Sequence, residues 1–382
     1  MLLSIIPNSA SPITSAIAGV IALLLVVCVW KCRKSPHRLS SSEIFFALSL
    51  CLLYYLFPMS GSDYFAYKEW VEGIGYIDVT QIPQFYLHYE KPYYVIVNFV
   101  QNNYLLFRLV VWGTSLLLYW QTARRLELDK SSFTFYLCIC IVQLSAVSRV
   151  CLAYALAYFG FSFLIKPITR RGSNIMSFVL GAAIVAVSLF FHRSAIYLLA
   201  ILPISLFIFN KKTIWLFAFA FPALVVLINT NLLDFLFSYD QSETSILDAD
   251  TAMLYLDSDR KRTVGIGQGI EFILKYGSHV AIVVLIIKSI LNKSYNAWPK
   301  HIQKFANATF FVTVFASSLL FSTDATTYKT FERLIAFAYV PQSIMLAYLL
   351  KQDYEKKTVN IATLLIAGYV VYSILYYNFH LA

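Results

Sequence analysis

Twelve runs of mostly apolar residues divide the chain, and this repetition limits the possible fold more than any single motif does. Each run has roughly the length that an α-helix needs to cross about 30 Å of hydrocarbon. In lipid the backbone must satisfy its own hydrogen bonds, so such runs predict helices. We expect an all-α, polytopic integral membrane protein with about twelve transmembrane helices, at 13–31, 43–59, 102–121, 132–148, 150–165, 174–191, 194–210, 213–230, 278–292, 305–322, 333–350 and 358–379.

The composition agrees with this class. Hydrophobic residues make up 59% of the 382 positions and charged residues only 13%, whereas about a quarter of a soluble domain is charged. The net charge of +10 does not indicate a nucleic-acid partner, because the basic residues form short clusters between the apolar runs. No cluster of metal-ligating residues is visible, since Cys138 and Cys140 lack the spacing and partners of a zinc site. No cofactor is expected.

The basic clusters predict which way the chain crosses the membrane. Loops on one side hold 19 basic and five acidic residues, a net charge of +14. The other side, with the adjoining helix ends, holds 11 basic and 15 acidic residues, a net charge of −4. The positive-inside rule makes the first side cytoplasmic. Both termini are then external, on the periplasmic side of a bacterial inner (cytoplasmic) membrane.

The loops leave no room for a separate soluble domain. We expect residues 1–382 to form a single polytopic membrane domain, with no Gly-rich phosphate loop on the cytoplasmic side. Two external segments are large enough to help build a site. They are a loop or interfacial segment at 59–101 and a large external loop at 231–277.

Polar residues gather at the predicted external helix ends, where the positive-inside rule disfavours basic ones. Each has a structural explanation as well as a functional one. An arginine at a helix end can extend to lipid headgroups, a carboxylate can cap a helix, and a histidine can simply pack. Together they suggest a site. The candidates are Asp63, Tyr64, Tyr67, Glu90, Tyr93, Arg108, Arg149, His192, Arg193 and Arg333.

A lipid-linked sugar would use every chemical type in this set. Arginine binds phosphate oxygens in a bidentate manner and could hold the pyrophosphate of a polyprenyl carrier. Aromatic rings offer faces on which sugars stack, and a carboxylate can orient or deprotonate an attacking hydroxyl. A pyrophosphate leaves readily once its charge is stabilised, so arginine could carry much of the catalysis. Since the sequence shows no metal cluster, we expect a metal-free mechanism.

Four segments resemble the EpsG-like branch of Wzy-type polysaccharide polymerases. They are GSDYFAY (61–67), YEKPYY (89–94), SRVCLAYALAYFGFSF (148–163) and FFHRSAIYLLAI (190–201), and they occur in the order seen in that family. Two positions depart from the family pattern. Val150 stands where a glutamine usually follows the arginine, so no role of that glutamine carries over, and Lys91 also differs.

The resemblance implies a glycosyltransferase with a GT-C-like helical membrane core. Its donor would be the growing polysaccharide on undecaprenyl pyrophosphate, and its acceptor a fresh lipid-linked repeat unit of O-antigen, capsule or exopolysaccharide. Membrane lipids surround such a protein, and a chain-length regulator protein is a further conceivable partner.

The resemblance also implies roles for the candidates. Asp63 or Glu90 would orient or deprotonate the acceptor, and His192 would donate or accept a hydrogen bond in the site. The remaining roles are phosphate contacts at Arg149, Arg193 and Arg333 and sugar platforms at Tyr64, Tyr67 and Tyr93. Arg108 is a candidate substrate contact on other grounds: inside an apolar span, it either extends outward or pairs with an acid or a phosphate.

Two other functions use similar features. A flippase or secondary transporter would also have about twelve spans, but it should show two related halves and polar, broken helices near the midplane. The sequence shows neither feature clearly. An O-antigen ligase would perform similar chemistry with the same external polarity, and the sequence does not separate it from a polymerase.

Overall fold

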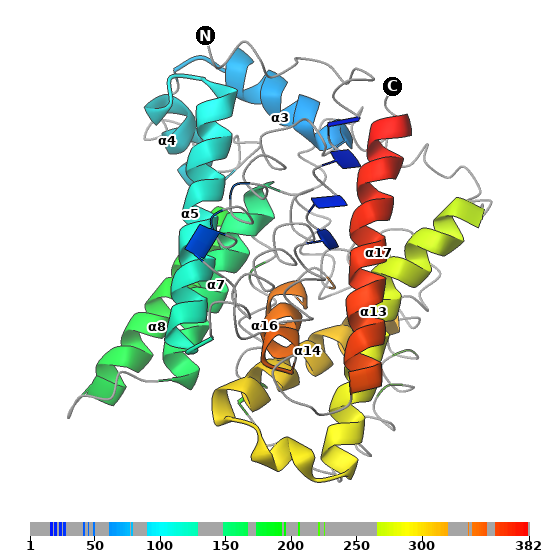
Figure 1. The fold of residues 1–382 in the computed structure, drawn as a ribbon. Helices are drawn as coiled ribbons and strands as arrows, with labels where there is room; N and C mark the ends of the chain where they lie inside the picture. The colour runs from blue at the N-terminus through cyan, green and yellow to red at the C-terminus, as the bar shows by residue number, and fades with distance from the viewer. Residues whose placement is uncertain are drawn as a thin grey trace.

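The computed structural model describes part of the chain, and every regular element in that part is helical (Figure 1). The described ranges are 61–76, 90–128, 148–166, 173–192, 266–319, 338–349 and 356–380. Single residues or pairs are described at 16, 17, 19, 20, 23, 24, 26, 27, 41, 42, 45, 49, 78, 195, 205, 206, 221, 225 and 335.

Seven of the expected helices lie in these ranges and are confirmed as helices. Their residues are α5 (Tyr104–Arg125), α7 (Ser148–Ile165), α8 (Ser173–Phe191), α13 (Ile266–Leu291), α14 (Lys300–Leu319), α16 (Tyr339–Leu349) and α17 (Lys356–His380). Of the expected helix at 13–31, residues 16, 17, 19, 20, 23, 24, 26 and 27 are described, and all of them are helical. The other four expected helices, at 43–59, 132–148, 194–210 and 213–230, lie almost wholly outside the described residues.

The expected external segments also contain regular structure. The 59–101 segment forms two helices, α3 (Gly61–Gly73) and α4 (Lys91–Phe99). Pro92 lies in the first turn of α4, where a proline costs no helical hydrogen bond. The 231–277 segment ends in helix, because α13 begins at Ile266. The rest of that segment lies outside the described residues.

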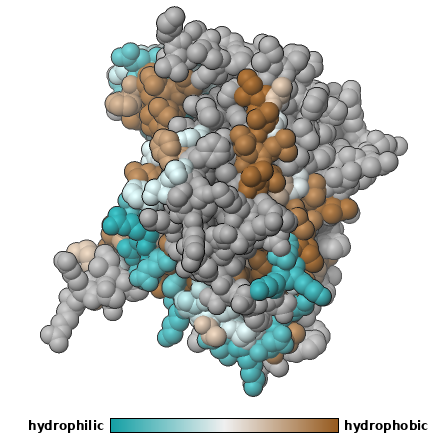
Figure 2. Space-filling view, viewed as in Figure 1, coloured by the Kyte–Doolittle hydropathy of each residue, from teal (hydrophilic) through white to brown (hydrophobic). Residues whose placement is uncertain are grey.

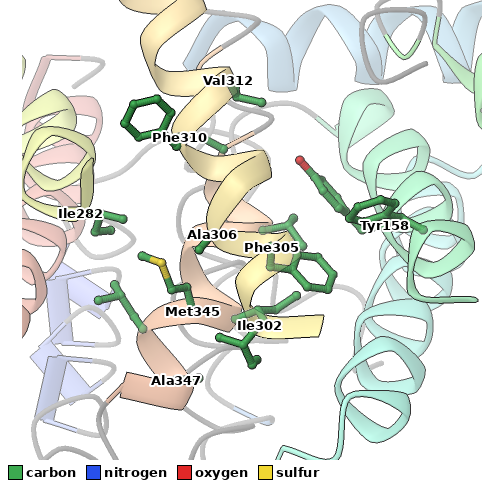
Figure 3. Packing of buried hydrophobic residues seen from close by; sticks show 14 of the residues in the cluster. Tyr158, Ile282, Ile302, Phe305, Ala306, Phe310, Val312, Met345 and Ala347 are labelled. Atoms are coloured by element: carbon green, nitrogen blue, oxygen red, sulfur yellow. The ribbon is translucent and has the colours of Figure 1, made fainter. Parts of the chain in front are cut away.

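The described helices form two packed groups. On one side α5, α7 and α8 lie together, with α3 crosswise over their upper end and α4 beside it (Figure 1). On the other side α13 packs along α17, and α14 packs against α16. Aromatic rings join the groups: Phe305 of α14 contacts Tyr158 and Phe161 of α7, with ring centroids 6.3 Å and 5.5 Å apart (Figure 3).

Two glycines allow α7 and α8 to cross at backbone contact. A Cβ built on Gly160 would lie 2.7 Å from the carbonyl oxygen of Gly181, and one built on Gly181 would lie 2.8 Å from that of Gly160. Real Cβ atoms do not come this close to a backbone oxygen. Small residues at a crossing let two helices approach closely enough for extensive van der Waals contact. The pair therefore fixes the hairpin formed by these two helices.

Basic residues mark one end of the described structure. Arg124 and Arg125 end α5, Lys300 begins α14, and Lys356 begins α17, and these termini lie at the lower end of the view (Figure 1). Hydrophilic residues gather over the same region, while a band of hydrophobic residues lies above it (Figure 2). This is the end that the charge pattern predicts to be cytoplasmic. Among the described helices, none is at once long enough and apolar enough to span a membrane.

An arginine joins α5 to α7 at this basic end. The Nε of Arg125 donates to the Oγ of Ser162 at 3.0 Å, and its Nη2 donates to the carbonyl oxygen of Lys166 at 2.6 Å. Its guanidinium also lies 3.5 Å from the ring centroid of Phe163. An ion pair also joins the residues that follow these two helices, with 2.7 Å between the Lys166 Nζ and the Glu127 Oε1. This hydrogen bond to Lys166 lowers the pKa of the exposed Glu127 carboxyl.

We expect Arg125→Met to lower the free energy of unfolding of the detergent-solubilised protein by about 1–3 kcal/mol. The change leaves a helix-terminal carbonyl and the Ser162 hydroxyl without their charged donor. Arg124→Met is the matched control, because Arg124 is the preceding residue and is exposed. Denaturant or thermal unfolding of both variants measures the difference, and equal stability of the two would contradict the role of Arg125.

A second polar network stabilises the same end. The Tyr295 hydroxyl hydrogen-bonds the side-chain oxygen of Asn307 and donates to the carbonyl oxygen of Gln303 at 3.0 Å. The Asn307 amide nitrogen in turn donates to the carbonyl oxygen of Ser205 at 3.1 Å. Tyr295 lies in the short 3₁₀ helix η4 (Ser294–Ala297), between α13 and α14. The network thus ties this turn to α14 and to residue 205, far away in the sequence.

Candidate functional site

Four aromatic rings form a continuous row at the end opposite the basic residues, with its two middle rings buried and its two outer rings half-buried. Trp70 contacts Phe107 with ring centroids 6.1 Å apart, Phe107 contacts Tyr93 at 6.2 Å, and Tyr93 contacts Phe191 at 5.9 Å. The first and last of these contacts are edge-on, an arrangement that aromatic pairs favour. We call these four residues the aromatic row. It joins α3, α5, α4 and α8, in that order.

The helix α3 brings the first candidates to this region. Asp63 and Tyr64 lie in its first turn, and their side chains lie outside the described part of the structure. Tyr67, one turn later, is buried in the same apolar cluster as the row. Trp70 follows after another turn and contacts both Phe107 and Tyr94. The aromatic side chains of α3 therefore hold this helix, and with it Asp63, against α4 and α5.

Glu90 sits immediately before α4. Its backbone is extended, with φ −67° and ψ 140°, and its carbonyl oxygen accepts a hydrogen bond from the Tyr93 amide at 3.0 Å. The carboxylate makes no capping bond to the helix and is half-buried. Tyr93, one turn later, is fully buried between Phe107 and Phe191. The Tyr93 ring thus packs against two other rings, and its role as a sugar platform stays a prediction.

Arg108 lies on α5 directly after Phe107 and is only 4% exposed. Its guanidinium carbon lies 5.8 Å from the ring centroid of Tyr104, one turn nearer the start of the helix. A cation over an aromatic face is attracted by the ring quadrupole. The contact directs the charged group toward the beginning of α5, which is the end where α3 and α4 lie (Figure 1).

The α7–α8 hairpin brings two further candidates to the same end. Arg149 is the second residue of α7, and Leu152, one turn later, is buried in the cluster around the row. The helix α8 ends at Phe191, and the half-buried His192 follows it directly. The His192 carbonyl oxygen then accepts a hydrogen bond from the Ala195 amide at 3.0 Å, so the chain turns here.

The structure therefore brings together the segments that carry most of the predicted residues. Described side chains are those of Tyr67, Glu90, Tyr93, Arg108 and His192. The side chain of Arg149 lies outside the described part, as do Arg193 and Arg333 entirely. Among the described residues, no group of three or more His, Cys, Asp or Glu side chains lies close enough together to hold a metal ion.

Sequence reasoning missed three members of the aromatic row. Trp70, Phe107 and Phe191 were not predicted as site residues, although Phe107 directly precedes Arg108 and Phe191 directly precedes His192. An aromatic residue next to a polar one at a helix end is the available signal. It is weak in a chain with 31 Phe and 27 Tyr.

Comparison with known proteins identifies the family. A model described as the EpsG family matches residues 17–382, nearly the whole chain. No curated protein and no solved structure gives a match. The match confirms the resemblance seen in the four sequence segments. The chain belongs to the EpsG family, a family of membrane proteins associated with exopolysaccharide biosynthesis.

Proposed function

We propose that this protein is a polysaccharide polymerase at the outer face of the bacterial cytoplasmic membrane. It joins oligosaccharide repeat units carried on undecaprenyl pyrophosphate. One observation carries the proposal: the segments bearing Asp63, Glu90, Arg108, Arg149 and His192 meet around one buried aromatic cluster. These residues supply the carboxylates and cations that transfer from a pyrophosphate donor requires.

The proposed topology has twelve membrane spans with both termini external. The common placement of the basic helix ends supports it, because those ends lie opposite α3 and α4 (Figure 1). Large apolar side chains exposed on the described helices also support it, since they would face lipid rather than water. They include Ile175, Phe178 and Val179 on α8 and Ile273, Val280 and Val284 on α13.

In the proposed reaction, a hydroxyl of the acceptor sugar attacks the anomeric carbon of the donor sugar. Asp63 or Glu90 takes the hydroxyl proton as the new carbon–oxygen bond forms. The bond from the anomeric carbon to the pyrophosphate breaks, and the leaving oxygen keeps the electron pair. Arg149, Arg193 and Arg333 stabilise the negative charge that develops on the undecaprenyl pyrophosphate. Arg108 contacts the substrate, and Tyr64 contacts its sugars.

The first test is a surface-polysaccharide gel from a deletion strain complemented with wild type, Arg193→Ala or Arg124→Ala. We expect the deletion to leave single repeat units on the final acceptor, because export and ligation continue without polymerisation. Wild type and Arg124→Ala restore the ladder of longer chains. Arg193→Ala does not, because it removes a phosphate contact and the loss of one charge-stabilising donor costs about 10²–10³ in rate.

Other outcomes separate the alternatives. A deletion strain with no external repeat units would place the block at or before export and would favour a transporter. Long chains that accumulate on the carrier but never reach the acceptor would favour a ligase. A full ladder from Arg193→Ala would remove Arg193 from the site.

A further inference from the structure

The ring contact between Tyr93 and Phe191 joins two elements that carry candidate reactive groups. Tyr93 belongs to α4, one turn after Glu90, and Phe191 is the last residue of α8, directly before His192. The two ring centroids are 5.9 Å apart, with the ring planes at 88°. This ring pair therefore joins the helix that follows Glu90 to the helix that precedes His192.

The helix α4 depends on such contacts for its position. It has only nine residues, and an isolated helix of that length is not stable in water. Its buried face consists of Tyr93, Tyr94 and Val97. Tyr93 reaches α8 through Phe191 and reaches α5 through Phe107, at a centroid distance of 6.2 Å. Removing the ring of residue 191 would therefore remove the contact through which Tyr93 reaches α8.

The two adjacent phenylalanines of α8 differ in their surroundings. Phe191 packs against the buried cluster, whereas the side chain of Phe190 is 65% exposed. They have the same chemistry and nearly the same distance from His192 along the chain. Phe190 is therefore a matched control for any effect of losing a ring at this helix end.

We propose that Phe191 and Tyr93 are positioning residues that set the external end of α8 against the start of α4. This inference rests on the proposed function. The pair holds His192 in place relative to Glu90 while the glycosyl group is transferred. Tyr93 acts through its buried ring and not as a surface on which a sugar stacks.

The test measures polymerisation by the purified full-length protein in lipid nanodiscs. The substrate is the lipid-linked repeat unit extracted from the deletion strain. We expect Phe191→Met to lower kcat about 10- to 100-fold, since small displacements of reacting groups have effects of this size, while KM stays near the wild-type value. Methionine keeps most of the side-chain volume, so the variant should fold. Phe190→Met should have the kcat and KM of wild type. Phe191→Tyr keeps an aromatic ring at this position and should retain the wild-type kcat.

A purely structural role would give a different pattern. It would reduce the amount of folded protein and leave kcat per folded molecule unchanged, which overturns the inference. Equal kcat for Phe191→Met and Phe190→Met would also overturn it. Tyr93→Phe should retain wild-type kcat and KM, and a raised KM in that variant would instead favour a sugar contact through the hydroxyl. A deletion strain with no external repeat units would overturn the proposed function itself. Normal polymerisation by Phe191→Met in an otherwise polymerase-dependent strain would overturn the positioning role alone.

Discussion

Replacing Gly160 with leucine is expected to disrupt the α7–α8 hairpin and to abolish polymer formation. A Cβ at this position would lie 2.7 Å from a backbone oxygen of α8 and 2.9 Å from the backbone nitrogen of Val185. Neither backbone atom can move without shifting the whole helix. Overpacking a well-packed interior typically costs about 1–3 kcal/mol. The cost of this substitution should lie at the upper end of that range, because a backbone atom cannot rotate out of the clash as a side chain can.

The functional loss follows from what the hairpin carries. The helix α7 begins next to Arg149, and α8 leads into His192 and Arg193. A wider crossing would move these residues apart at the end where the proposed reaction occurs. Loss of the long polysaccharide ladder in a complemented deletion strain measures this, together with the amount of protein in the membrane.

Gly113→Leu is the matched control. Gly113 lies within α5, and nothing lies within 4 Å of the position that its Cβ would take. The same substitution there should leave protein level and ladder close to wild type. Gly160→Ala adds only the clashing carbon and should fall between the two. Wild-type polymer from Gly160→Leu would show that the close crossing is dispensable.

The apolar pattern predicted the helices well where the helix and the apolar run coincide. The expected spans 150–165 and 174–191 match α7 and α8 to within two residues at each end. The prediction was less accurate where helix continues into polar sequence. The helix α5 runs to Arg125, four residues past the expected end, because the arginine is held by hydrogen bonds to α7. The helix α13 begins at Ile266, twelve residues before the expected start, in a segment containing three glycines, a glutamate and a lysine.

The site was predictable only in part. Chemistry in the sequence pointed to Glu90, Arg108 and His192, because polar residues at apolar helix ends are conspicuous. The aromatic row was not predictable, because its contacting members are separated by 14 to 98 residues and no periodicity links them. Tyr93 illustrates the difference. Its position in YEKPYY suggested a sugar platform, and only the fold shows that its ring is enclosed by two others.

Phe107→Ala is expected to be the most damaging single change in the aromatic row. Phe107 is fully buried and contacts three other rings, those of Trp70, Tyr93 and Tyr104. Removing a buried phenylalanine side chain typically lowers the free energy of unfolding by about 3–5 kcal/mol, because a cavity is left behind. Leu106→Ala is the matched control, since Leu106 precedes it on α5 and is 43% exposed.

The consequences of this cavity should extend beyond stability. The helix α3 carries Asp63, and α4 directly follows Glu90. Both helices contact α5 through the ring of Phe107. Without that ring their positions relative to Arg108 are no longer fixed, so polymerisation should fall even in the fraction of protein that remains folded. Unfolding in detergent and kcat in nanodiscs measure the two effects separately. A Phe107→Ala protein as stable and as active as Leu106→Ala would show that the aromatic row does not organise the site. A protein that is less stable but retains wild-type kcat would limit the row to a structural role.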